Sequence, residues 1–86
     1  MTRVLYFARS VERDLARLPR EVVVRFMRAF DALLIDPSRP RPGLDIRPMR
    51  RERGVWRLRV GPYRAIYRFS KTEVTVYEVG HRGNFY

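Results

Sequence analysis

The sequence predicts an α+β domain in which an N-terminal helical hairpin packs on one face of a mostly antiparallel sheet, in the order β-α-α-β-β-β. Three observations predict this class. A short apolar segment opens the chain, two stretches with helical spacing of apolar residues follow, and the C-terminal third alternates between apolar and polar residues. The chain of 86 residues suffices for one core, so we expect residues 1–86 to form a single domain.

The first strand and the first helix are predicted from apolar spacing near the N-terminus. Residues 3–8 carry apolar side chains on both alternating faces, which is typical of a strand covered on both sides. Ser10 can cap the helix that follows, and Pro19 ends that helix. The apolar residues of this helix repeat along one stripe, which consists of Val11, Leu15 and Leu18.

A longer helix and an irregular connection are predicted for the middle of the chain. The helix begins at Glu21 and ends before Asp36 and Pro37. Its apolar residues at helical spacing are Val23, Phe26, Met27, Phe30, Leu33 and Leu34. Residues 37–54 contain four prolines, glycine and many arginines, so we expect an ordered but irregular connection without a regular element.

The C-terminal part predicts a meander of three strands. Apolar residues and arginines alternate up to the two-residue turn at Gly61 and Pro62, and the chain then returns as a second strand. This turn places Arg59 opposite Arg64. One face of the hairpin is apolar and consists of Trp56, Leu58, Val60, Tyr63, Ala65, Tyr67 and Phe69. A third strand is expected over residues 73–79, with its register left open.

The other face of the hairpin gathers positive charge, because Arg57, Arg59 and Arg64 share it. Like charges that lie opposite one another destabilise a sheet unless an anion neutralises them. A solvated face needs some charge in any case, so the pattern alone leaves a structural role open. A phosphate site is favoured because glutamate or mixed charges would serve solubility better.

Composition narrows the chemistry that this chain can perform. The chain has 19 Lys and Arg against 9 Asp and Glu, a formal charge of +10, and all but one of these cations are arginine. Arginine binds phosphate and carboxylate through a planar fork, which predicts an anionic partner. The absence of cysteine and the single histidine argue against disulfides, thiolate nucleophiles and metal clusters, and we expect no cofactor. No run approaches a membrane span, so we expect a soluble cytoplasmic protein.

The end of the last predicted strand adds candidates for catalysis. His81 is either a hydrogen-bonded residue at a strand end or a group for proton transfer near neutral pH. Tyr86 is either a disordered end residue or a ring that stacks on a base. The sequence pattern by itself leaves both alternatives open.

Residues 56–67, together with Val79-Gly80-His81-Arg82 and Tyr86, resemble the signature of the RelE/ParE superfamily of type II toxin–antitoxin toxins. The order of the preceding strand and helices fits as well, so the resemblance implies a RelE-like, microbial RNase-like fold for the whole chain. RelE-like members are ribosome-dependent endoribonucleases. By resemblance, their site falls on Arg57, Arg59, Arg64, Arg82 and Tyr86, to which the chemistry adds His81. Further arginines are expected to bind the substrate, namely Arg50, Arg51, Arg53 and Arg68.

The resemblance implies a toxin that cleaves messenger RNA in the ribosomal A site through attack of a 2′-hydroxyl on the phosphate, which inhibits translation. One alternative is a ParE-like inhibitor of DNA gyrase that is not an enzyme. Another is a basic module that only binds nucleic acid, with an affinity that falls steeply as salt rises. Both toxin hypotheses imply an acidic cognate antitoxin in a hetero-oligomer, and the nuclease also requires the ribosome and messenger RNA.

Overall fold

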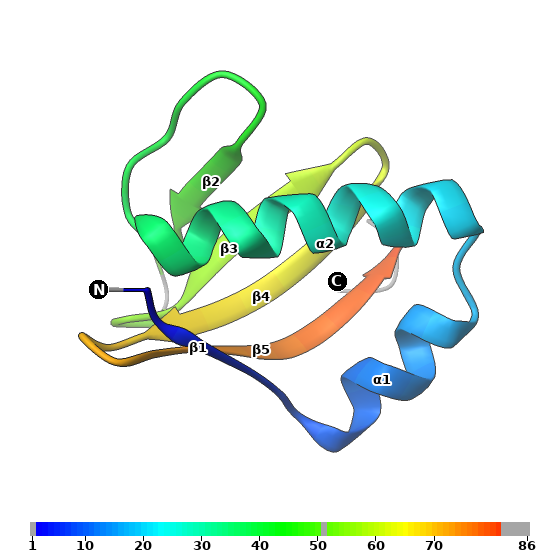
Figure 1. The fold of residues 1–86 in the computed structure, drawn as a ribbon, viewed down its shortest axis with the longest axis horizontal. Coiled ribbons are helices and arrows are strands. Elements are labelled where there is room, and N and C mark those ends of the chain that lie inside the picture. The colour runs from blue at the N-terminus through cyan, green and yellow to red at the C-terminus, as the bar shows by residue number, and fades with distance from the viewer. Residues whose placement is uncertain (1, 51, 82–86) are drawn as a thin grey trace.

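The computed structural model of the chain describes residues 2–50 and 52–81, which form two helices on a five-stranded sheet (Figure 1). The elements in chain order are β1 (Val4–Phe7), α1 (Arg9–Ala16), α2 (Arg20–Ile35), β2 (Asp45–Pro48), β3 (Trp56–Val60), β4 (Tyr63–Phe69) and β5 (Glu73–His81). The predicted class is confirmed. The predicted order was one strand short, because it omitted β2.

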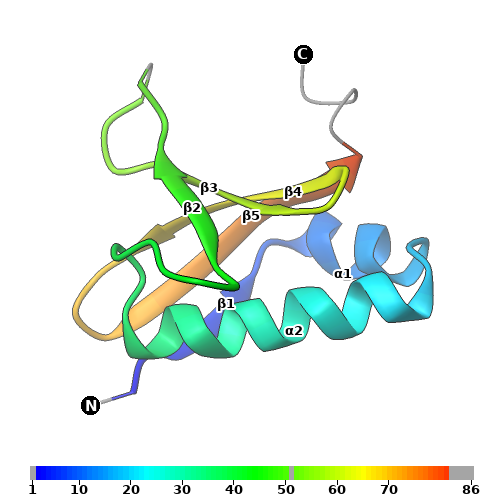
Figure 2. The ribbon, with the colours of Figure 1, turned by 90° about the horizontal axis from the view of Figure 1, so that it is seen from above.

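The strands lie in the order β1-β5-β4-β3-β2. The chain reverses between consecutive strands from β2 to β5, so these pairs are antiparallel, and only β1 pairs in parallel, with β5. Both helices lie on one face of the sheet and leave the other face open (Figure 2). The two-residue turn after β3 gives the expected register, with Arg59 opposite Arg64.

The strand that the sequence did not predict, β2, lies inside the proline-rich segment 37–54. It pairs antiparallel with β3 and places Asp45 opposite Arg59. Pro48 is compatible with this strand because β2 lies at the edge of the sheet and Pro48 is its last residue. Local composition predicted a loop here, but pairing with residues of β3 that lie 8 to 14 positions later along the chain makes this segment a strand.

The prediction that the first strand is covered on both sides was wrong. Leu5 and Phe7 pack against the core, but Val4 and Tyr6 are 54% and 51% exposed. The reason is architectural, since the helices cover one face of the sheet only.

The helices follow the predicted stripes with small shifts. Ala8 takes the N-cap position of α1 and makes no side-chain cap, so Ser10 lies within the helix instead of capping it. Val11 and Leu15 are buried, as expected. In α2 the buried valine is Val22 and not the predicted Val23, because the orientation of the helix on the sheet decides which of the three adjacent valines is buried. Met27, which was also predicted on the apolar stripe, is exposed.

The core fills the space between the helices and the sheet. The ring of Phe30 lies 5.6 Å from that of Phe7 and 5.7 Å from that of Phe26, measured between centroids. Tyr67 is fully buried, and its hydroxyl donates a 2.7 Å hydrogen bond to the carbonyl oxygen of Pro37. Burial raises the pKa of Tyr67. Neither helix in the described part of the chain is long and apolar enough to cross a membrane.

Candidate functional site

The open face of β3 and β4 carries the three arginines that the alternating pattern predicted. Arg59 lies opposite Arg64, and Arg57 lies opposite Ile66. This face is less exposed than expected. Arg64 is 7% exposed and the side chain of Arg57 16%, against 42% for that of Arg59. The connection between β2 and β3 stands on this side of the sheet and contributes to the burial (Figure 2).

Asp45 supplies the anion that this face needs. Both Nε and Nη2 of Arg59 lie 2.9 Å from Oδ2 of Asp45, and Nη2 of Arg57 lies 3.5 Å from Oδ1. Asp45 offsets one of the three positive charges of Arg57, Arg59 and Arg64, and Arg47 adds another positive charge opposite Arg57. Asp45 thus orients two arginines and leaves the cluster cationic. This role could not be predicted from the sequence, because it depends on the pairing of β2 with β3.

The surroundings of Arg57 disfavour its positive charge. Burial of its guanidinium lowers its pKa, the nearby charge of Arg64 lowers it further, and Asp45 opposes the shift. Its Nε is buried and donates no hydrogen bond to any residue that the structure describes. A buried donor without a hydrogen bond costs folding stability, and such groups often mark functional sites.

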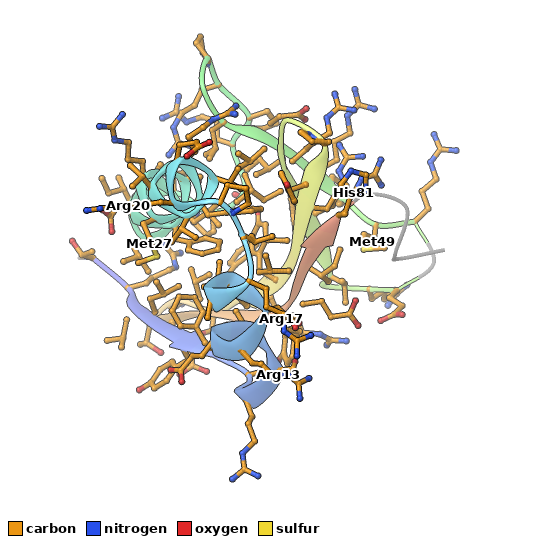
Figure 3. All side chains as sticks on the ribbon, turned by 90° about the vertical axis from the view of Figure 1, so that its right-hand side faces the viewer. Arg13, Arg17, Arg20, Met27, Met49 and His81 are labelled. Atoms are coloured by element: carbon orange, nitrogen blue, oxygen red, sulfur yellow. The ribbon has the colours of Figure 1, made fainter. Side chains whose placement is uncertain are left out.

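A pocket of about 460 Å³ opens beside the arginines. Its lining residues are Arg64, Ile66 and Arg68 from β4, Tyr77 and Glu78 from β5, and Met49, Glu52 and Val55 from the β2–β3 connection. Figure 3 shows Met49 on the side of the sheet away from α2. The pocket therefore belongs to the same open face as the arginine cluster.

A β-bulge explains how two consecutive residues reach this pocket. Tyr67 pairs with Val76 whereas Ile66 pairs with Glu78, so Tyr77 is the extra residue of β5. In a regular strand, Tyr77 and Glu78 would point to opposite faces. Sequence alternation alone could not assign both residues to the site.

The predicted substrate-binding arginines have different positions. The guanidinium of Arg68 lies 3.9 Å from the carboxylate of Glu52 and 6.0 Å from the ring centroid of Tyr77, at the pocket. Arg50 and Arg53 are exposed on the β2–β3 connection and do not line the pocket. The predicted residues Arg51, Arg82 and Tyr86 lie outside the described residues.

His81 lies apart from the arginines. It pairs with Tyr63, and the two rings meet edge to face with centroids 5.5 Å apart. Tyr63 packs toward the core, so this contact places the imidazole on the helix side of the sheet, whereas Arg64 points to the open face. His81 lines a separate pocket with residues of α1, and among the described residues Glu78 alone borders both pockets.

Across residues 2–50 and 52–81, no three His, Cys, Asp or Glu side chains lie close enough together to hold a metal ion. The chemistry that this face offers is cationic. It can bind phosphate groups through Arg57, Arg59 and Arg64, and the adjoining pocket can accept a planar group.

Several solved structures with the same fold are toxin–antitoxin complexes. The chain is 31% identical to a chain of the RelBE2 complex from Mycobacterium tuberculosis, with a TM-score of 0.77, and the match covers 95% of this chain and 100% of that one. It is 26% identical to a chain of the archaeal RelE–RelB complex from Pyrococcus horikoshii OT3, with a TM-score of 0.79 and coverage of 96% and 98%. A chain of the DinJ–YafQ complex from Escherichia coli shares the fold at 9% identity, with a TM-score of 0.81 and coverage of 100% and 99%.

No curated protein sequence matches the chain at a significant level. A family model does match it. This model describes the ParE toxin of the type II toxin–antitoxin system parDE, and it spans residues 5–86. The chain therefore belongs to the ParE toxin family, within the RelE/ParE superfamily, and is a toxin of the type II toxin–antitoxin class.

Proposed function

We propose that this toxin is a ribosome-dependent endoribonuclease that cleaves messenger RNA and so stops translation. The observation that carries the proposal is the partly buried cluster of Arg57, Arg59 and Arg64 on the open face, beside a pocket that can hold a base. Burial of like charges destabilises the fold, so such a cluster is best explained by an anionic ligand.

The chemistry needs few protein groups because RNA supplies its own nucleophile. The 2′-oxygen attacks the adjacent phosphorus, the bond to the 5′-oxygen breaks, and the products are a 2′,3′-cyclic phosphate and a 5′-hydroxyl. The arginines stabilise the added negative charge on the phosphoryl oxygens. Asp45 fixes the forks of Arg57 and Arg59, so their donors are oriented before RNA binds.

Proton transfer requires groups other than arginine, which rarely gives up its proton. By resemblance to RelE-like toxins, we assign a further phosphate contact to Arg82 and assign to Tyr86 proton transfer or stacking on the nucleotide. We do not place His81 in this set, because its ring packs against Tyr63 on the helix side of the sheet.

We further propose an acidic antitoxin as the partner of this chain in a hetero-oligomer. The similar solved chains come from complexes of a toxin with its antitoxin, RelB or DinJ. The formal charge of +10 on this toxin complements an acidic partner.

The second candidate function is inhibition of DNA gyrase without catalysis. The match to the ParE family model favours it. This function requires neither phosphate binding by the arginine cluster nor a base pocket, so mutations on the open face distinguish the two candidates.

The deciding experiment is primer extension on cellular messenger RNA after brief induction of wild type, Arg64→Gln and Arg82→Ala. Arg13→Gln is the matched control, because Arg13 is exposed on α1. Circular dichroism of each purified variant verifies that it is folded. We expect new in-frame cuts in wild type and Arg13→Gln that require translation and disappear in the other two variants.

Two other outcomes contradict the nuclease. Growth arrest with intact messenger RNA and stalled gyrase–DNA complexes supports the gyrase inhibitor. Undisturbed growth together with salt-sensitive binding of nucleic acid supports a simple binding module.

A further inference from the structure

We propose that the pocket on the open face is a nucleobase subsite that selects guanine, and that Glu78 is the residue that recognises it. This inference rests on the proposed function, because it assumes that RNA binds to the arginine cluster. It adds the specificity of the site, which the arginines alone cannot provide, since phosphate contacts carry no base information.

The pocket has the shape and surface that a single base requires. Its volume is about 460 Å³, which fits one nucleobase with part of its sugar. Val55 is buried and Met49 and Ile66 are half-buried, so they give it an apolar floor. Arg64 belongs to both the pocket and the arginine cluster. A base in the pocket therefore lies next to a phosphate on the cluster.

Two planar groups offer stacking surfaces at the pocket. The ring of Tyr77 is 41% exposed, and the guanidinium of Arg68 lies 6.0 Å from its centroid. Single-stranded RNA bases stack on aromatic rings and on arginine planes. An exposed tyrosine that a cation contacts from within the same pocket is suited to this role.

Polar groups at the pocket select among the four bases. Glu78 presents a carboxylate, which in its ionised form only accepts hydrogen bonds. Guanine carries two adjacent donors, N1–H and the 2-amino group, which match the two oxygens of a carboxylate. Its O6 and N7 acceptors match an arginine such as Arg64. Adenine, cytosine and uracil each place a ring or carbonyl acceptor beside their donor, and a carboxylate repels that acceptor.

Glu78 suits this role better than Glu52, the other carboxylate at the pocket. The bulge in β5 directs Glu78 toward the pocket, and its backbone is fixed by pairing with Ile66. Glu52 belongs to the connection between strands, and its carboxylate lies 3.9 Å from Arg68. We therefore assign base recognition to Glu78 and positioning of Arg68 to Glu52.

Binding of mononucleotides tests the subsite without any cleavage. Guanosine, inosine and adenosine 3′-monophosphates are titrated into the purified toxin, and amide shifts in β4 and β5 are followed by NMR. Inosine differs from guanosine only by the missing 2-amino group. We expect guanosine to bind roughly tenfold more tightly than inosine, because inosine loses one hydrogen bond to a charged carboxylate. Adenosine should bind at least as weakly as inosine, because its N1 is an acceptor and it has no 2-amino group.

Glu78→Gln is the informative variant and Glu73→Gln the matched control, since Glu73 is exposed at the far end of the same strand. Glutamine keeps the size of glutamate but turns one acceptor into a donor, so we expect it to remove the preference for guanosine and to leave the affinity for inosine within about twofold. Equal affinities of wild type for all three nucleotides, or an unchanged preference in Glu78→Gln, overturn the proposal.

Cleavage on programmed ribosomes separates this proposal from the nuclease itself. A-site codons carry guanine or inosine at each position in turn. If neither the replacement of guanosine by inosine nor Glu78→Gln changes the cleavage, the nuclease activity is supported and the guanine subsite is rejected. Selective binding of guanosine without any cutting supports the subsite and rejects the nuclease.

Discussion

The two faces of β3 and β4 are built from the same segment of chain but have opposite properties. On the helix side, Leu58 and Tyr67 are 1% and 0% exposed and belong to the core. On the open side no helix covers the sheet, yet Arg64 is buried and Arg57 is largely buried. The first face stabilises the fold through apolar burial. The second concentrates like charges, and Asp45 offsets part of this charge at Arg57 and Arg59.

Alternate residues of the same strands therefore have different roles: those on the helix side stabilise the fold, and those on the open side are available for binding. Adjacent residues such as Arg64 and Ala65 therefore have different roles although they share a backbone. Mutations on the helix side should act on the free energy of unfolding. Mutations on the open side should act on binding and leave the fold nearly intact.

The largest effect is expected for Phe30→Ala on the helix side. Phe30 is 0% exposed and contacts the rings of Phe7 and Phe26, so its truncation leaves a cavity and should destabilise the fold by about 3–5 kcal/mol. Chemical denaturation of the purified variant measures this value. A loss of folding stability below about 1 kcal/mol would contradict the assignment of Phe30 to the core.

A smaller effect is expected for Tyr67→Phe, which removes one hydroxyl from the helix side. The carbonyl of Pro37 then loses its hydrogen bond, and stability should fall by about 1–2 kcal/mol at pH 7. The pH dependence sharpens the test. Because the pKa of Tyr67 is raised in the fold, its contribution is complete below about pH 10 and is lost as pH rises toward the folded pKa. Denaturation between pH 8 and 11 should show a steeper loss in wild type than in Tyr67→Phe, and equal slopes would contradict the role of this residue.

Asp45→Asn tests the charge balance on the open side. It leaves Arg57 and Arg59 without their carboxylate, and we expect a loss of up to about 1 kcal/mol, because Asp45 is 40% exposed and water screens the pairs. The loss should shrink as salt rises. Thermal unfolding at low and high salt measures it against Asp31→Asn, an exposed site on α2. A loss that does not depend on salt would argue against an electrostatic role.

The smallest effect on stability is expected for Arg57→Gln. Burial and Arg64 both lower the pKa of Arg57, so its charge is unfavourable in the fold at neutral pH. Removal of that charge should leave stability within about 0.5 kcal/mol of wild type or raise it. Under the proposed function, the same variant loses its toxicity in a growth assay. Destabilisation by more than about 2 kcal/mol would break the separation between the two faces.

Part of this molecule follows from local sequence alone. The hairpin of β3 and β4 was predicted in its register, because a two-residue turn fixes which residues face each other and a period of two fixes the faces. The starts of the helices were predicted within two residues by apolar spacing and by the prolines that bound them. The arginine cluster followed from the same alternation.

Tertiary structure alone decided the rest. Residues 45–48 became a strand because β3 offers hydrogen-bond partners that lie far along the chain, and that pairing brought Asp45 to Arg57 and Arg59. The bulge in β5 places both Tyr77 and Glu78 at the pocket on the open face, whereas His81 pairs with Tyr63 and lies on the helix side. Sequence determined which side chains alternate along each strand, but only the pairing of distant strands decided which charges meet, because electrostatic and hydrogen-bond contacts depend on distance in space and not on separation along the chain.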